Sequence, residues 1–236
     1  MKRILDWRLL TALLVFVFGM VVTSCGGNPD GGVAVDLGLP SGTLWADRNI
    51  GADSPEDCGD YFAWGETEPK TTYDWSTYKW CNGSDGTIDE TLTKYCYRCS
   101  HYKTTLEPED DAATANWGKS WYMPTKTQIK ELENECTWTW TTQNDVKGYK
   151  VTGPNGNSIF LPASGCCEDS GTIYYGDGNY AGKIHGVGIY AGYWSSSLYE
   201  DPSDAWYLSF YSQSFDRNRK KRYEGHAVRA VCVANN

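Results

Sequence analysis

The stretch ANWGKSWYMPTKTQIKEL, residues 115–132, carries the most consistent local signals in this chain. Thr125 is a good helix N-cap, and Gln128 follows three residues later, which is the capping-box pattern. Pro124 precedes the cap, outside the helix, where it costs no hydrogen bond. A narrow apolar stripe follows at helical spacing, formed by Ile129, Leu132 and Cys136. The stretch therefore predicts a helix of about three turns that packs by one face.

Before this helix, the acidic run at residues 107–111 leads into Ala112–Ala115. Either Asp110 or Asp111 would suit the N-cap of a second, shorter helix, because acidic groups are favoured at the positive end of a helix. The region from Thr67 to Glu109 is acidic and rich in Thr and Cys, and it is typical of a long loop.

Elsewhere the chain alternates short apolar runs with glycine turns. The candidate strands are Val33–Leu37, Leu44–Ile50, Tyr61–Gly65, Tyr149–Thr152, Ser158–Leu161, Tyr193–Ser197, Ala205–Tyr211 and His226–Val233. Pro40-Ser41-Gly42 predicts a turn between the first two, and the Asn155-Gly156 pair predicts a hairpin between the fourth and fifth. We expect the last three to form an antiparallel meander. Four tryptophans in strand or turn motifs are expected in the core: Trp64, Trp121, Trp194 and Trp206.

The first segment predicts export. Three basic residues within the first eight precede an apolar run from Leu9 to Val22, which has the length of a signal peptide and is short for a membrane span. Small residues then precede Cys25, as at a bacterial lipoprotein cleavage site. The alternative is a plain secretory signal with an incidental cysteine. We expect a signal peptide at 1–24, a lipidated Cys25 on a flexible tether at 25–32, and a single domain at 33–236.

The charge of the chain limits its partners. The 236 residues carry a formal net charge of −9, and removing residues 1–24 makes the chain more acidic because that segment is basic overall. An acidic surface disfavours nucleic acid as a partner. We therefore expect a membrane contact through the lipid anchor and a glycan or protein ligand, in an outer-membrane lipoprotein of the cell envelope.

The cysteine count fits an exported chain. Apart from Cys25 there are eight, an even number that predicts structural disulfides: Cys58, Cys81, Cys96, Cys99, Cys136, Cys166, Cys167 and Cys232. A pairing of Cys136 with Cys232 would link the helix to the last strand. Cys96-Tyr97-Arg98-Cys99 has the spacing of a zinc or redox motif, but a second ligand pair and a βαβ setting are missing, so a structural disulfide is preferred.

Six segments occur in an order that resembles a known family: VDLGLPSGTLWADRNIGA (35–52), GDYFAWGE (59–66), LEPEDDAATANWGKSWYMPT (106–125), GNSIFLPASG (156–165), GYWSSS (192–197) and GHAVRAVCV (225–233). Together they resemble the Fibrobacter succinogenes major paralogous domain family of exported Bacteroidetes-type lipoproteins. That family is similar to the C-type-lectin-like fold. The helix start also looks like the corresponding segment of formylglycine-generating-enzyme-type domains.

This resemblance implies an α+β, C-type-lectin-like domain with a twisted antiparallel sheet, one or two short helices and long irregular loops. It does not imply an activity. The calcium-binding triplets of sugar-binding C-type lectins are absent, because Glu107-Pro108-Glu109 does not match them. Cys166 and Cys167 are adjacent, unlike the two cysteines of the formylglycine enzymes. We therefore expect no metal and no cofactor.

Two stretches are candidate ligand-binding sites. The loop at 163–192 is rich in Gly and Tyr, and its recognition candidates are Tyr174, Tyr175, Asp177, Asn179 and Tyr180. A packed structural loop is the alternative. The second stretch lies between the last two predicted strands and is therefore expected at a hairpin tip; its cations are Arg217, Arg219, Lys220, Lys221 and Arg222. These either bind an anionic ligand or form a solvated loop.

Catalysis has little support. The three histidines, His101, His185 and His226, lie far apart in sequence, and no GxSxG or HExxH motif occurs. The preferred hypothesis is a non-catalytic lipoprotein that binds glycan or protein. The second is a structural or assembly component of a surface or fimbria-like complex. The third is an enzyme acting on envelope sugars, for which Asp60, Glu66 and Glu68 are the nearest grouped carboxylates.

Overall fold

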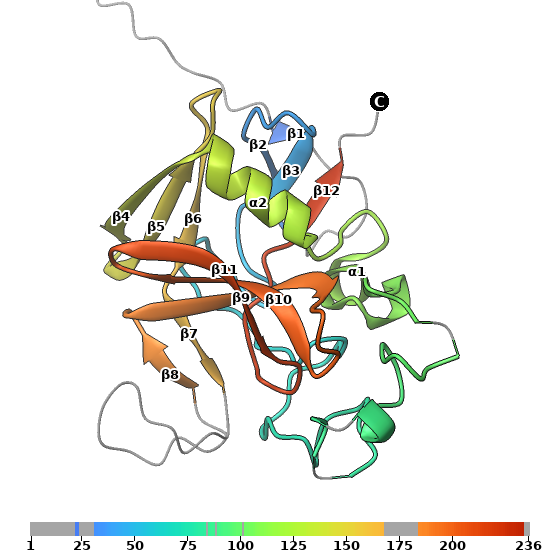
Figure 1. Cartoon of the computed structure of the whole chain (residues 1–236). Coiled ribbons are helices and arrows are strands. Elements are labelled where there is room, and N and C mark those ends of the chain that lie inside the picture. The colour runs from blue at the N-terminus through green and yellow to red at the C-terminus, as the bar shows by residue number, and fades with distance from the viewer. Residues whose placement is uncertain are drawn as a thin grey trace, which may run out of the picture.

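The computed structural model describes residues 31–83, 85–87, 89–100, 102–167 and 184–233, and the backbone of a two-residue strand, β1 (Val22–Thr23). In these residues three mostly antiparallel sheets and two α-helices form a mixed α+β fold (Figure 1). The predicted α+β class is confirmed at this level. No helix in the described ranges is long and apolar enough to cross a membrane.

The helices begin where their capping residues predict. Helix α2 (Lys126–Glu135) starts after Thr125, whose hydroxyl accepts from the backbone N–H of Gln128 while the Gln128 side chain accepts from the Thr125 N–H. Helix α1 (Ala112–Trp117) starts after Asp111, whose carboxylate accepts two backbone N–H groups of the first turn. The buried residues of α2 are Ile129 and Leu132, and the helix packs against the strands of the largest sheet.

A four-stranded sheet joins the two ends of the chain in the order β1-β2-β3-β12, with β2 (Ala34–Asp36), β3 (Thr43–Ala46) and β12 (Val231–Val233). The predicted turn closes the β2–β3 pair: the N–H of Gly42 donates to the carbonyl of Leu39 at 2.9 Å, and Gly42 has φ +70°. That backbone conformation is one that glycine adopts without steric cost. The first two predicted strands are therefore confirmed, although both are shorter.

A three-stranded sheet follows α2, with β4 (Thr137–Gln143), β5 (Val146–Thr152) and β6 (Ser158–Pro162) in sequence order. The predicted hairpin corresponds to β5 and β6. Strand β4 was not predicted, although its Thr–Trp alternation is a strand pattern. Its turn uses Asn144 and Asp145, both at positive φ (+46° and +65°), which is the geometry of a two-residue hairpin turn.

The largest sheet has the order β11-β10-β9-β7-β8. Its strands are β7 (Ser164–Cys167), β8 (Ile184–Val187), β9 (Tyr190–Leu198), β10 (Asp204–Tyr211) and β11 (Ser214–Lys221). All nine residues of β9 are buried, because both faces of this strand pack against the hydrophobic core. One short parallel contact joins β7 to β9, and the other pairings in this sheet are antiparallel.

The predicted C-terminal meander is partly wrong. Strands β9 and β10 form as predicted, but β10 pairs next with β11. The chain then crosses to the other sheet, where β12 pairs with β3. Of the predicted His226–Val233 strand only the last three residues form a strand, preceded by isolated bridges at His226 and Ala227. The predicted alternation is nevertheless real, because Val228, Ala230 and Cys232 enter one core cluster while Ala227 and Val231 enter another. The predicted strand at 61–65 is also wrong, since only the isolated bridge between Phe62 and His226 forms there.

Buried side chains connect these sheets. Trp64, Trp121 and Trp194 are fully buried as predicted, whereas Trp206 is only half-buried. Arg229 is also fully buried, and its guanidinium donates to the side chain of Asn49 and to the carbonyls of Ala46 and Phe160. Because Ala46 ends β3 and Phe160 lies in β6, this arginine joins two sheets through hydrogen bonds that satisfy a buried charge.

The cysteine predictions have mixed outcomes. Cys96 and Cys99 form a disulfide with their Cα atoms 5.2 Å apart, so a structural disulfide replaces the zinc reading of that motif. The proposed Cys136–Cys232 pairing is wrong, because Cys136 is a free thiol and Cys232 is disulfide-bonded. Cys58, Cys81, Cys166 and Cys167 also carry thiols and form no disulfide in the described residues. Cys25 lies outside the described residues.

Candidate ligand-binding groove

A groove forms where the loop after β9 meets the cysteine-rich loop. The backbone at residues 104–106 extends along the end of β9, with Leu106 N–H donating to Ser196 and Leu198 N–H donating to the carbonyl of Thr104, at 2.9 and 2.8 Å. Two hollows of about 520 and 400 Å³ lie side by side here and share Tyr199 and Glu200 in their walls. We call these two hollows and their rim the aromatic groove.

Exposed tyrosines form the rim of the aromatic groove. Tyr97 is 58% exposed and Tyr102 is 43% exposed, and their ring centroids are 5.3 Å apart. The Tyr97 hydroxyl donates to the backbone carbonyl of Glu200, so it joins the two loops. Tyr199, in the shared wall, packs edge-on against Trp206 with centroids 4.9 Å apart. Large aromatic side chains held at the surface in this way offer flat apolar area beside polar groups.

The first hollow is acidic. Glu200 and Asp201 are exposed in its wall, and Asp201 accepts from the backbone N–H and the hydroxyl of Ser203 at 2.9 and 2.8 Å. Burial by itself would raise the pKa of Asp201, but the hydrogen bonds from Ser203 and the nearby charges of Lys221 and Arg219 outweigh it and lower the pKa. Asp201 is therefore a carboxylate at neutral pH, and it accepts hydrogen bonds.

The second hollow is lined by hydroxyl groups and one cation. Its threonines are Thr104, Thr105, Thr125 and Thr127. The ammonium group of Lys126 lies 5.0 Å from the centre of the Trp206 ring, which holds the lysine in a cation–π contact. Hydroxyls can both donate and accept hydrogen bonds, so this wall suits a ligand with many hydroxyl groups of its own.

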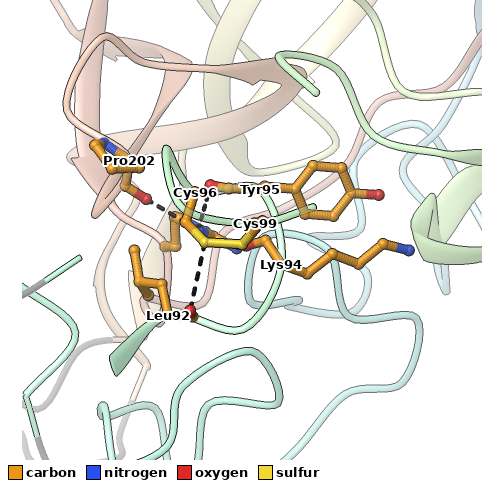
Figure 2. Close-up of a disulfide and its surroundings, with 7 residues drawn as sticks. Leu92, Lys94, Tyr95, Cys96, Cys99 and Pro202 are labelled. Atoms are coloured by element: carbon orange, nitrogen blue, oxygen red, sulfur yellow. Dashed lines mark hydrogen bonds between the residues drawn. A yellow bond between two sulfur atoms is a disulfide. The ribbon is translucent and has the colours of Figure 1, made fainter. Parts of the chain in front are cut away.

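A buried arginine holds both loops of the groove together. Arg222 is fully buried, and its guanidinium donates to the carbonyl of Pro202 on one side, at 2.9 Å. On the other side it donates to the carbonyls of Tyr95 and Lys94, at 3.2 and 3.0 Å, and to the hydroxyl of Tyr78 at 2.8 Å. Figure 2 shows Pro202, Tyr95 and Lys94 around the neighbouring Cys96–Cys99 disulfide. The hydrogen bonds of the Arg222 guanidinium thus connect the two walls of the groove.

The arginine also contacts aromatic rings. Its guanidinium carbon lies 4.9 Å from the centre of the Trp64 ring and 5.2 Å from that of Tyr78. Within the described residues no carboxylate pairs with Arg222, so carbonyl oxygens and aromatic faces provide its stabilisation.

The predicted basic tip is not a hairpin tip. Residues 217–221 lie inside strand β11, and Arg222 follows it directly. The other four cations of this run are partly or fully exposed, and each is near a carboxylate: Arg217 with Glu133, Arg219 and Lys221 with Asp204, and Lys220 with Glu224. A ligand role for Arg222 is wrong because the side chain is buried. For Arg217, Arg219, Lys220 and Lys221 such a role stays a prediction, in a setting where charges are already balanced.

The second predicted site falls mostly on residues that are not described. Tyr174, Tyr175, Asp177, Asn179 and Tyr180 all lie outside the described ranges. Of the predicted loop, only its ends are described, and there the Nε2 atom of His185 lies 3.5 Å from the sulfur of Cys166. Within the described ranges no group of three or more His, Cys, Asp or Glu side chains could hold a metal ion.

Sequence reasoning missed the aromatic groove. Tyr97 lies inside the Cys96–Cys99 motif, whose sequence pattern indicates only the chemistry of its sulfurs. Tyr199 and Glu200 lie between two predicted strands and belong to no motif of their own. No local pattern indicates that these segments meet, because about 100 residues separate them in the chain and β-pairing at that separation leaves no periodic signal.

A larger hollow, about 750 Å³, lies apart from the groove, between Pro108, Glu109, Thr114, Lys119 and Tyr122. Its lining has a single aromatic ring, so it lacks the paired exposed tyrosines that distinguish the aromatic groove. Comparison with known proteins does not choose between these sites: the chain matches no protein-family model, no curated protein and no solved structure.

Proposed function

We propose that this chain is a non-catalytic lipoprotein of the cell envelope that binds a glycan in the aromatic groove. The supporting observation is the exposed pair Tyr97 and Tyr102 at the rim of two hollows lined by carboxylates and hydroxyls. The C–H face of a sugar ring is apolar and packs on an aromatic ring, while its hydroxyl groups need donors and acceptors around the edge. The groove offers both.

The size of the groove favours more than one sugar unit. The two hollows together extend on both sides of the wall formed by Tyr199 and Glu200. A chain of two or three sugars would therefore cross this wall, whereas a single sugar would occupy one hollow. Preformed pockets of several hundred cubic ångströms are the usual size for small-molecule recognition.

The envelope location and the fold family remain part of the proposal. The signal segment and Cys25 support lipid anchoring, and two or more acyl chains on one cysteine would anchor firmly. The α+β architecture agrees with a C-type-lectin-like domain, in which loops carry the ligand. A Cys25→Ala chain that still partitions with membranes would contradict the anchor.

The test of glycan binding is an array of envelope and plant-type oligosaccharides probed with the mature chain and with Tyr97→Ala and Tyr102→Ala variants. We expect each variant to bind at least about tenfold more weakly, a loss of about 1.4 kcal/mol. Tyr211→Ala is the matched control, because Tyr211 is an exposed tyrosine (37%) in β10, outside the groove lining. Glycan binding that survives both rim substitutions would exclude this groove, and a silent array would exclude the function.

A protein partner is the second candidate, favoured by one observation. Strand β8 is the edge of the largest sheet, and exposed apolar side chains cluster on and after it: Ile184, Val187 and Ile189, each about half exposed. Exposed apolar edges commonly mark contact surfaces. If the chain is an assembly component, a partner should co-purify with the wild-type chain and be lost with Ile184→Lys and Ile189→Lys.

A further inference from the structure

The Cys96–Cys99 disulfide lies directly beside the groove. Only two residues separate the cysteines, and both are exposed: Tyr97 on the rim and Arg98 next to it. Tyr97 reaches across to Glu200, so the short loop closed by the disulfide presents the rim tyrosine to the opposite wall. Tyr97 is therefore carried by a short loop that the disulfide closes.

The backbone next to the disulfide is held in an unfavourable conformation. Tyr95 has φ +58°, a left-handed conformation that is costly for a bulky residue. Surrounding contacts fix it there: its carbonyl accepts from Arg222, its hydroxyl donates to Asp110, and its ring packs against Trp64 at 5.2 Å. Backbone strain of this kind is found where the surroundings hold a functional segment in place.

The two cysteine residues differ in exposure. Cys99 is half-buried, whereas Cys96 is 1% exposed and belongs to a core cluster. The sulfur of Cys96 lies 3.4 Å from the carbonyl oxygen of Leu92 (Figure 2). In the disulfide this sulfur has no proton to donate. After reduction the buried thiol would find an acceptor already in position, which lowers the cost of leaving a polar group in the core.

We propose that the Cys96–Cys99 disulfide is a redox-sensitive clamp that positions Tyr97 for ligand binding, so that a dithiol reductant weakens binding in the aromatic groove. The inference rests on the glycan-binding function proposed above. Exposed disulfides are the ones that thiols reach most readily, and disulfides in strained surroundings are the labile ones. Here Cys99 is only half-buried, and Tyr95, next to Cys96, has a strained backbone conformation.

The reaction balances with two electrons from the dithiol. Its thiolate attacks the sulfur of Cys99, the Cys96–Cys99 bond breaks, and Cys96 leaves as a thiolate that takes up a proton. The second thiol of the reductant then attacks the mixed disulfide. Cys99 leaves as a thiol, and the reductant becomes an intramolecular disulfide. Tyr97 is then carried by an open segment rather than a closed loop.

The test compares the mature chain before and after treatment with dithiothreitol. Differential alkylation with mass mapping identifies the opened bond, which matters because Cys232 is also disulfide-bonded. Amide hydrogen exchange then follows residues 94–103. We expect Cys96 and Cys99 to become alkylated first and exchange in this segment to rise at least about tenfold, while β9 and β10 stay protected. Unchanged exchange after confirmed opening of this bond would overturn the clamp.

A double variant, Cys96→Ser with Cys99→Ser, separates this bond from the others. It should show the fast exchange without reductant, and dithiothreitol should add nothing. The same glycan array is probed with both redox forms. Equal binding by both forms would overturn the clamp and leave the glycan function standing. An array that is silent for both forms would overturn the glycan function, and hydrogen exchange would still decide whether the disulfide positions Tyr97.

Discussion

At the residue scale, charge buried without a counter-charge is the most consequential feature of this domain. Arg222 and Arg229 are both fully buried, and both are satisfied by carbonyl, amide or hydroxyl oxygens within the described residues. Burial lowers the pKa of Arg229 to about 10, so it stays charged at neutral pH. Removing such a group destabilises the fold, because each lost donor leaves a buried acceptor unpaired.

The first prediction concerns Arg222. Replacing it with Met keeps much of the volume but removes every donor to Pro202, Tyr95, Lys94 and Tyr78. We expect the free energy of unfolding to fall by about 3–5 kcal/mol, because four buried acceptors lose their donor at about 1 kcal/mol or more each. Urea denaturation measures it. Arg219→Met is the control, because that side chain is about half exposed and its ion pair contributes little. A loss below about 1 kcal/mol would contradict the role given to Arg222.

The second prediction concerns Asp111, which caps α1 and also accepts from the N–H of Met123 at 2.8 Å. Burial raises the pKa of Asp111 to about 6, against the ordinary value of 3.8, despite these hydrogen bonds. The folded state therefore binds the proton more tightly than the unfolded state. It follows that the contribution of this group to stability falls as the pH rises from about 4 to 6.

Asp111→Asn removes the titration. The unfolding free energy of the wild type minus that of the variant should fall by about 3 kcal/mol from pH 3 to pH 7, at 1.36 kcal/mol per pKa unit. Chemical denaturation at several pH values measures the difference, and other carboxylates cancel because both proteins contain them. A difference that does not change with pH would show that Asp111 titrates normally.

At the element scale, local sequence signals worked where the element is defined by its own residues. The capping box of Thr125 and Gln128 forms as predicted, and so does the hairpin that contains Asn155-Gly156. Strand β11 was missed because its run of Arg and Lys resembles a solvated loop. Its ion pairs show that a strand beside acidic neighbours such as Asp204 and Glu133 can carry such charges.

The third prediction concerns the turn between β4 and β5. Asp145 has φ +65°, in the region where glycine has no steric cost, and Asn-Gly is the preferred sequence for this turn. Asp145→Gly should therefore stabilise the domain by up to about 1 kcal/mol, read from thermal or urea unfolding. Gly156→Ala is the opposite control: Gly156 has φ +87° with open space around it, so only backbone strain changes. Gly156→Ala should lower the free energy of unfolding by about 1 kcal/mol. Effects of the same sign in both variants would contradict the assignment of both changes to backbone strain at positive φ.

At the scale of the whole molecule, the α+β class agrees with what the family resemblance implies, but the assembly of the sheets was not predicted. The pairing of β12 with β3 and the bridge between Thr105 and Ser197 connect segments that are distant in the chain. Alternation of side chains reports which face of a strand is buried, but not which strand lies beside it. The aromatic groove arises from one of these distant contacts, so the same limit hid the candidate site.

The anchoring proposal has a consequence for the fold. If the mature chain begins at Cys25, it lacks β1, which pairs with β2 through only two residues on each strand. At about 1 kcal/mol per net backbone hydrogen bond, a chain of residues 25–236 should lose at most about 2 kcal/mol of unfolding free energy relative to a chain that retains β1. Circular dichroism and urea denaturation of the two purified chains measure this.

A deeper truncation provides the control for that prediction. A chain beginning at Gly42 also loses β2 and three buried apolar side chains, Ala34, Leu37 and Leu39. Each buried leucine is worth about 1.5–3 kcal/mol, so this chain should unfold at much lower urea concentration or fail to fold cooperatively. If the chain of residues 25–236 behaved like the deeper truncation, β1 would be an essential strand of the domain. Cleavage before Cys25 would then be incompatible with this fold.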